Sequence, residues 1–315
     1  MTTQTQPHAG LSELTGPLMV LAGGICIGFA PIGVRLGLEG LGPQALAFWR
    51  YAFAFPVLFL LVVVANRRLP ARPNPFILVA GACFALDIAL WHWSLTYTTV
   101  ANATFIVNLG NIGVGFLAWL FLKETPSWLW GMAVILAILG AAGLSLGGAA
   151  IPIEARPYVL RGDLLALGAA ILVSGYMLAS KVARRNLGGL DTIFWLTGVE
   201  ILVSGMIVLL SGERFIPEHM IGFLVPLFLA LVVQVGGQGL IITGLGHTPA
   251  GLAGVLVLVQ PVVAAAVSWR LFGEALAPLQ AGGAVLILVG IFLAQRGNRQ
   301  NASKASQEPI TSFID

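Results

Sequence analysis

The side chains that could bind a polar ligand lie inside long apolar runs. Asp87 lies in the middle of one such run, and Trp91 follows it by about one helical turn on the same face. A charged group at the centre of a bilayer costs roughly 2.5–3.5 kcal/mol on insertion scales, so an acid there needs an explanation. An acid beside aromatic rings can hold an ammonium group next to an apolar one. The alternative is a neutral Asp87 that is hydrogen-bonded between helices, and the sequence leaves both interpretations open.

Carboxamide side chains occur in other apolar runs. Asn108 and Asn111 are three residues apart, which places them on one helix face. Gln238 lies in a Gly-rich stretch, and Gln260 precedes Pro261. Amides donate and accept hydrogen bonds and so suit a zwitterion, although they also join helices at under about 1 kcal/mol each. The candidate substrate-binding residues are Asp87, Trp91, Asn108, Asn111, Gln238 and Gln260.

Three further residues are candidates for coupling or gating. Glu200 lies centrally in an apolar run, where it could carry a coupled proton or pair with Arg50. Arg50 is the basic residue that falls clearly inside a run rather than in a loop. Pro261 frees a backbone carbonyl near the middle of its run, and such breaks often line transport cavities.

The composition indicates what surrounds these residues. Of the 315 residues, 58% are hydrophobic and 9% are charged. A soluble domain is typically about 25% charged, so this surplus of apolar surface needs lipid to face. A spanning helix needs about 20 mostly apolar residues. Such runs lie near 17–37, 43–65, 75–97, 99–122, 126–147, 162–184, 190–211, 218–245, 249–272 and 276–296. We therefore expect an all-α integral membrane protein with ten transmembrane helices.

The loop charges predict an orientation. Ten spans put both termini on one side of the membrane. If that side is the cytoplasm, its loops hold ten Lys and Arg residues against five on the other side. Basic residues favour cytoplasmic loops, so we expect a multi-pass protein of the cell (inner) membrane with both termini cytoplasmic.

The two halves of the chain resemble each other. At an offset of 146 residues, the Phe48-Trp49 pair meets Phe194-Trp195. At an offset of 150, Trp119 meets Trp269. An odd number of spans in each half turns the second half over, which gives two inverted five-helix repeats around a central cavity, an architecture of many secondary transporters. The expected divisions are a polar N-terminal tail (1–15), the first repeat (16–150), a linker (151–160), the second repeat (161–296) and a polar C-terminal tail (297–315).

The ends of the halves carry a family resemblance. The first reads TTVANATFIVNLGNIGVGFLAWLFLKETPSWLWGMAVILAILGAAGLSLGG from Thr98, and the second reads TPAGLAGVLVLVQPVVAAAVSWRLFGEALAPLQAGGAVLILVGIFLAQR from Thr248. Both have a small-residue helix, an apolar run, a closing Glu (Glu124, Glu274) and a Gly-rich helix. This pattern resembles the EamA repeat of the drug/metabolite transporter superfamily. Within that superfamily, the chain resembles aromatic amino-acid exporters of the YddG type. The first half departs from the pattern at Asn111, where the second half has Pro261.

The resemblance implies ten helices around a central cavity and, commonly, export. We expect a secondary transporter that exports amino acids, aromatic ones included, or similar small metabolites by alternating access between the repeats. It is expected to work as a monomer in contact with membrane lipids. The alternatives are a sugar-phosphate or nucleotide-sugar antiporter and an intramembrane serine protease. A phosphate site would want several buried basic residues, and the aromatic and amide side chains fit amino acids better.

Other classes of function find little support in the sequence. Gly143-Leu144-Ser145-Leu146-Gly147 matches G-x-S-x-G, but its confirming context would be a strand-turn-helix elbow. No Walker A motif is present, so ATP-driven pumping is not indicated. The basic residues are scattered in short loops, which gives no basis for nucleic-acid binding. Cys26 and Cys83 lie in separate apolar runs and predict neither a disulfide framework nor a metal site. We expect no enzyme activity, cofactor or metal.

Overall fold

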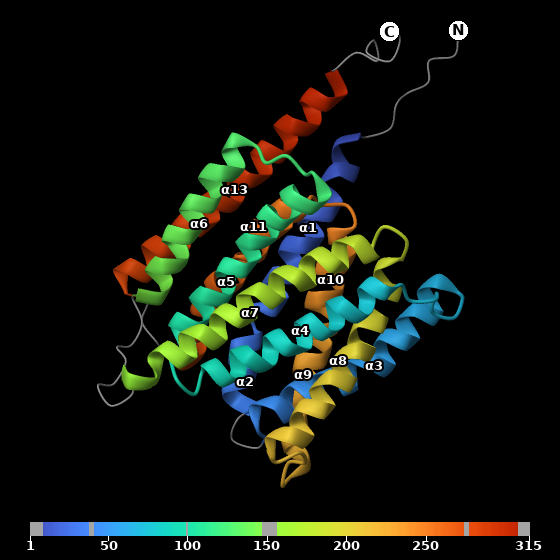
Figure 1. Cartoon of the computed structure of the whole chain (residues 1–315), viewed down its shortest axis with the longest axis vertical. Coiled ribbons are helices and arrows are strands. Elements are labelled where there is room, and N and C mark those ends of the chain that lie inside the picture. Colours follow the sequence, from blue (N-terminus) through green and yellow to red (C-terminus); the bar gives the residue numbers. More distant parts are fainter. Residues whose placement is uncertain (1–8, 38–40, 99, 147–155, 274–276, 308–315) are drawn as a thin grey trace.

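The chain folds as a bundle of membrane-crossing helices in the computed structural model. The structure describes residues 9–37, 41–98, 100–146, 156–273 and 277–307. In this part of the chain every regular element is helical, and ten helical segments cross the bundle (Figure 1). In chain order the elements are α1 (Ala9–Ile27), α2 (Ala30–Gly37), α3 (Pro43–Asn66), α4 (Pro75–Ser94), α5 (Val100–Leu117), η1 (Ala118–Leu122), α6 (Trp128–Leu146), α7 (Arg156–Ala183), α8 (Gly189–Ser211), η3 (Met220–Phe223), α9 (Leu224–Phe228), η4 (Leu229–Gln238), α10 (Gly239–Leu245), α11 (Ala250–Val257), α12 (Val259–Phe272) and α13 (Pro278–Gln307).

The predicted number of membrane helices is confirmed. Nine helical segments of the described chain are long and apolar enough to span a bilayer, and the tenth, α6, has a shorter apolar stretch over Trp128–Gly143. Three helix ends differ from the expected boundaries. Helix α1 begins at Ala9, inside the expected N-terminal tail. Helix α7 begins at Arg156, inside the segment expected as a linker, and α13 continues to Gln307, inside the expected polar tail. Glu274 lies outside the described residues.

Two of the crossing helices are broken, and proline explains both breaks. Helix α1 ends at Ile27, four residues before Pro31, and α11 ends at Val257, four residues before Pro261. Proline has no N–H to donate to the carbonyl four residues earlier, and its ring clashes with that carbonyl. The sequence predicted the break at Pro261, whereas the break at Pro31 was not predicted.

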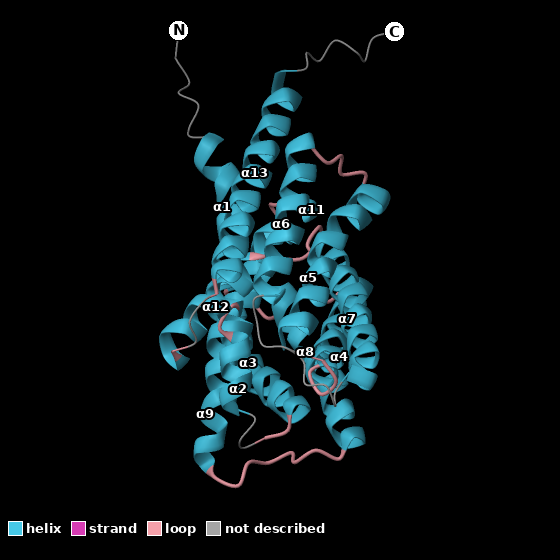
Figure 2. Ribbon diagram, turned by 90° about the vertical axis from the view of Figure 1, so that its left-hand side faces the viewer, coloured by secondary structure: helices cyan, strands magenta, loops and turns pink. Residues whose placement is uncertain are grey.

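The helices pack against one another around the centre of the bundle. Helix α6 lies along α13 at one side, and α3 lies along α8 at the opposite side (Figure 1). Helices α4 and α5 both pack against α7, and α1 packs against α10 and η4. The first described residues of α1 and the last of α13 lie at the same end of the bundle, as an even number of crossings requires (Figure 2).

Glycine lets the central helices approach each other closely. A Cβ added to Gly254 of α11 would overlap with the backbone carbonyl oxygen of Asn111 in α5. A Cβ added to Gly110 of α5 would meet the carbonyl oxygen of Ala170 in α7 in the same way. Small residues at helix interfaces replace the hydrophobic driving force that lipid does not provide. Both sides of α5 are therefore fixed against a neighbour.

Helix α5 contacts only one part of the broken ninth crossing closely. It packs against α11, whereas α12 packs against α1, α2, α6 and α13. At the α11 end, the Glu124 carboxylate accepts a hydrogen bond from the backbone N–H of Ala250 at 2.7 Å, and the indole of Trp130 donates to the carbonyl of Gly251 at 2.9 Å. These contacts join the two halves of the chain at the end where α1 begins.

Acidic side chains link helix ends across the α3–α8 pair. Glu213, just after α8, accepts hydrogen bonds from the backbone N–H groups of Gln44 and Ala45 at the start of α3, at 2.8 and 3.3 Å. Asp191, in the first turn of α8, forms a bidentate pair with Arg68, just after α3, at 3.1 and 2.6 Å. Carboxylates at helix N-termini satisfy backbone donors and favour the positive end of the helix dipole. The Glu213 cap and the Asp191–Arg68 pair link the two ends of α3 to α8.

Candidate functional site

A cavity lies at the centre of the bundle, where the two broken helices face each other. It leaves about 150 Å³ for the centres of water-sized molecules. Both proline breaks contribute to its wall, through Ile27 and Pro31 on one side and Val257 and Pro261 on the other. Its other walls come from α3, α4, α5, α7, η4 and α10. Irregular backbone at membrane depth is tolerated where it is buried in protein or lines a cavity, which is its place here.

Most of the predicted site residues line this cavity. Those that do are Arg50 from α3, Asp87 and Trp91 from α4, Asn108 and Asn111 from α5, and Gln260 and Pro261 from α12. The expectation that Gln238 faces the cavity is not met, because its amide is buried behind the wall against Glu200 and Tyr176. Glu200 is also fully buried outside the lining.

Asp87 presents an unpaired acceptor in this cavity. Its side chain is 3% exposed, and its Oδ1 atom has no hydrogen-bond partner within the described protein. Two other lining residues share this property, His92 through Nδ1 and Thr104 through Oγ1. Buried polar atoms in proteins are nearly always paired, so each exception needs an explanation. A polar ligand in the cavity would provide the missing partners.

The asparagines of α5 form a short chain of hydrogen bonds along the wall. Asn108 donates from Nδ2 to the carbonyl of Thr104 at 2.8 Å, and Asn111 donates from Nδ2 to Oδ1 of Asn108 at 3.1 Å. The two amides thereby fix each other's orientation. A carboxamide NH₂ group has two donors, and each of these bonds uses one of them. The amides therefore keep capacity for a ligand.

Arg50 is held by a network of glutamines on the far side of the cavity wall. It donates from Nε and Nη2 to Oε1 of Gln234 at 3.0 and 2.7 Å, and Nη2 lies 3.4 Å from Oε1 of Gln238. Each glutamine then donates from Nε2 to Glu200, at 2.6 Å from Gln234 and 3.2 Å from Gln238. Arg50 and Glu200 are therefore partners, as the sequence suggested, but through two amides rather than directly. Gln234 was not among the predicted site residues.

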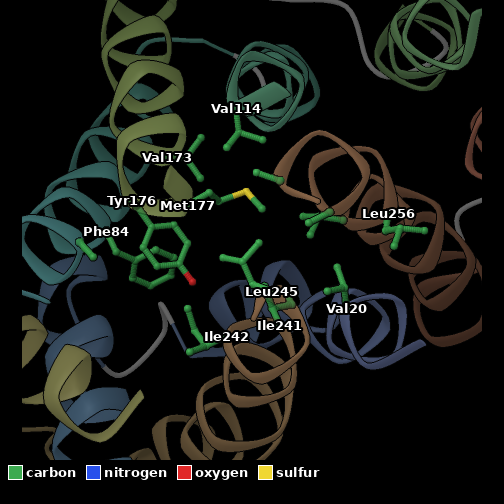
Figure 3. Close-up of a cluster of buried hydrophobic side chains, with 14 of the residues drawn as sticks. Val20, Phe84, Val114, Val173, Tyr176, Met177, Ile241, Ile242, Leu245 and Leu256 are labelled. Carbon is green, nitrogen blue, oxygen red and sulfur yellow. The ribbon is translucent and has the colours of Figure 1, made fainter. Parts of the chain in front are cut away.

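Apolar and aromatic side chains form the remaining wall. Phe84 of α4 packs against Tyr176 of α7, with ring centroids 4.7 Å apart. Val173 and Met177 lie beside Tyr176, and Ile241 of α10 approaches from the other side (Figure 3). The guanidinium carbon of Arg50 lies 5.7 Å from the centre of the Phe84 ring, within reach of a cation–π interaction. A ligand would thus meet a cation, an acid and an apolar surface in one space.

Comparison with known proteins places this architecture in a family. The model of the EamA-like transporter family matches residues 14–146 and again residues 160–295. The chain belongs to the EamA-like transporter family. The double match shows a duplicated repeat, and a transporter of this family moves a small molecule across a membrane and is not an enzyme. Consistent with this, Ser145 lies within the helix α6, without the strand that a nucleophile elbow requires, while Gly147 lies outside the described residues.

Several relatives are identical to this transporter at about a quarter of their aligned residues. The uncharacterized transporter YwfM of Bacillus subtilis is 26% identical over 76% of this chain and 80% of its own. A probable terminal-alkyne amino-acid exporter of Streptantibioticus cattleyicolor is 26% identical over 86% of this chain and 91% of its own. The uncharacterized inner membrane transporter YhbE of Escherichia coli is 27% identical over 58% of each chain. A solved crystal structure of a protein with 18% identity superposes with a TM-score of 0.75 over 90% of this chain and 99% of its own, which supports the fold.

Proposed function

We propose that this secondary transporter exports amino acids, aromatic ones included. The observation that carries the proposal is that one cavity is lined by both the unpartnered Asp87 carboxylate and the Arg50 guanidinium. These two described side chains make no ion pair with each other, yet they are near enough to interact electrostatically. An α-amino acid carries the two complementary charges on groups that are bonded to the same carbon atom. Asp87 would bind the ammonium group, and Arg50 with the α5 amides would bind the carboxylate.

The apolar wall supports a hydrophobic side chain on the substrate. Phe84, Trp91, Val173, Met177 and Ile241 surround the charged groups. Binding sites for small molecules typically combine a mostly apolar lining with a few convergent polar groups. Aromatic amino acids match this combination. The relative named as a probable terminal-alkyne amino-acid exporter supports an amino acid as the substrate. Among the described lining residues only Arg50 and His92 can carry a positive charge, which favours a carboxylate over a phosphate.

Alternating access would use the two broken helices. Helices α5 and α11 are joined at the end where α1 begins, while α12 packs against other helices. A rearrangement about the Pro261 break could separate α5 from α11 at this end and close the helices at the opposite end. The inverted repeats give the opposite end an equivalent set of elements. The repeats are fused in one chain, so we assign transport to a monomer of the inner membrane. The Lys and Arg count supports cytoplasmic termini.

Amino-acid efflux from cells tests the proposal. Cells that express the transporter are loaded with a dipeptide of phenylalanine and tryptophan, and the amino acids released into the medium are followed by mass spectrometry. Expression is expected to raise the efflux rate of one or both amino acids above that of cells with an empty vector. The variant Asp87→Asn serves as a control for indirect effects of expression, and its efflux should fall toward the empty-vector rate. Equal efflux from all three strains would contradict the proposal.

A further inference from the structure

The contact between Arg50 and Gln234 is unusual for a buried guanidinium. Arg50 is 6% exposed and lines the cavity, and two of its nitrogens donate to a single amide oxygen. Buried arginines usually pair directly with a carboxylate, since a bidentate ion pair compensates best for the loss of water. Here a carboxylate is close by, on Glu200, and yet a neutral amide occupies the position next to the guanidinium.

The orientation of the Gln234 amide follows from its two neighbours. Its Oε1 faces the guanidinium, while its Nε2 donates to Glu200 Oε2 at 2.6 Å and to Thr197 Oγ1 at 2.9 Å. The reverse orientation would set NH₂ against the cation and C=O against the carboxylate. Gln234 therefore holds both charged groups and separates them, and the two described side chains of Arg50 and Glu200 form no direct ion pair. Gln238 makes a second, longer bridge between the same two groups.

This separation affects what the cavity can bind. Glu200 remains near enough to stabilise the buried cation electrostatically, and the face of the Tyr51 ring, 5.0 Å from the guanidinium carbon, adds a cation–π contact. The hydrogen bonds to protein use Nε and Nη2, and the guanidinium has a third nitrogen, Nη1. A direct Glu200 pair would instead neutralise the cation before a substrate arrives.

We infer that Gln234 is a positioning residue that sets selectivity for carboxylate-bearing substrates, because it holds Arg50 at the cavity through an uncharged amide. This inference rests on the proposed function and names the group that distinguishes an amino acid from the amine formed by its decarboxylation. A purely structural role for Gln234 would affect stability and the binding of both ligands alike. Selectivity between the two ligands is therefore the informative quantity.

The test moves the negative charge of Glu200 to position 234, next to Arg50. In the double variant Gln234→Glu, Glu200→Gln the net charge is unchanged, but the carboxylate lies directly against Arg50. In the single variant Glu200→Gln the amide of Gln234 remains and the distant carboxylate is lost. Affinities for tryptophan and tryptamine are measured by competition on the purified protein in detergent, with thermal melting as a check on folding. Gln44→Leu is the matched control, since Gln44 is a buried glutamine of α3 that donates to the Ala89 carbonyl outside this network.

We expect wild type, Glu200→Gln and Gln44→Leu to prefer tryptophan by about tenfold or more, the contribution of one charged hydrogen bond. The double variant should bring that ratio to within about threefold of one. If the double variant does not fold, Gln238→Glu replaces it and is expected to lower the ratio less, because its bridge to Arg50 is longer. An unchanged ratio in a folded variant, or binding of both ligands by wild type without preference, would overturn the inference alone. Wild type that binds no amino acid would overturn the proposed function as well.

Discussion

Replacing Asp87 by Asn tests the other end of the substrate. The substitution keeps the shape of the side chain and removes its charge. Because Oδ1 has no hydrogen-bond partner among the described residues, the change should leave the free energy of unfolding unaltered or raise it. An ammonium group about 4 Å from the carboxylate would gain about 4 kcal/mol at an effective dielectric constant of about 20. After desolvation, a charged hydrogen bond is worth about 1.5–3 kcal/mol, so the Kd should rise about 10- to 150-fold.

A ligand without the ammonium group isolates this contact. Affinities of wild type and Asp87→Asn are compared for tryptophan and for indole-3-propionate, which lacks the amino group. The loss should be confined to tryptophan. Asp191→Asn is the matched control, since Asp191 is equally buried but pairs with Arg68 away from the cavity. It should lower the melting temperature and leave both affinities unchanged. An equal loss for both ligands in Asp87→Asn, or no loss for either, would refute the assignment of the ammonium group to Asp87.

Three further predictions concern packing, orientation and the functional unit. Gly254→Ala should lower stability by about 1–3 kcal/mol in thermal unfolding, because the added methyl group overlaps with the Asn111 carbonyl. Gly239→Ala should not lower it, because its methyl group meets no atom within 4 Å. Equal stability of the two variants would contradict the close α5–α11 contact. A cysteine in place of the exposed Glu218 should react with an impermeant thiol reagent in intact cells, and one in place of Arg72 only after lysis; the reverse pattern would overturn the orientation. Flux from vesicles that contain active protein and an excess of an inactive variant should stay proportional to the active copies, and a steep loss on mixing would show that the functional unit is larger than a monomer.

Much of the fold was predictable because lipid makes the helical signal strong. The apolar runs and the proline and glycine breaks placed ten crossings, and the recurring Phe-Trp and Trp positions indicated the repeat. Asp87, Trp91, Asn108 and Asn111 were brought to one cavity by helical periodicity and by the short connection between α4 and α5. The break at Pro31 was missed, although the rule that predicted the break at Pro261 applies to it equally.

The glutamine network could not be read from the sequence in the same way. Arg50 and Gln234 are 184 residues apart, and their contact depends on how α3 packs against η4 rather than on any local pattern. Gln238 was expected to bind substrate in the cavity, but η4 is π-helical from Leu229 to Gln238. A π-helix turns less per residue than an α-helix, so faces inferred from a period of 3.6 residues drift. That local geometry puts both glutamines behind Arg50 rather than in the cavity.

Counterflow in reconstituted vesicles tests the central claim most directly. Vesicles with the purified transporter are preloaded with unlabelled tryptophan or phenylalanine and diluted into a trace of the labelled amino acid, with and without a pH gradient. The account predicts transient accumulation of label that depends on the preload, and that is lost in Asp87→Asn. Accumulation no greater than in protein-free vesicles, for every amino acid tried, would contradict the claim that this cavity carries amino acids across the membrane.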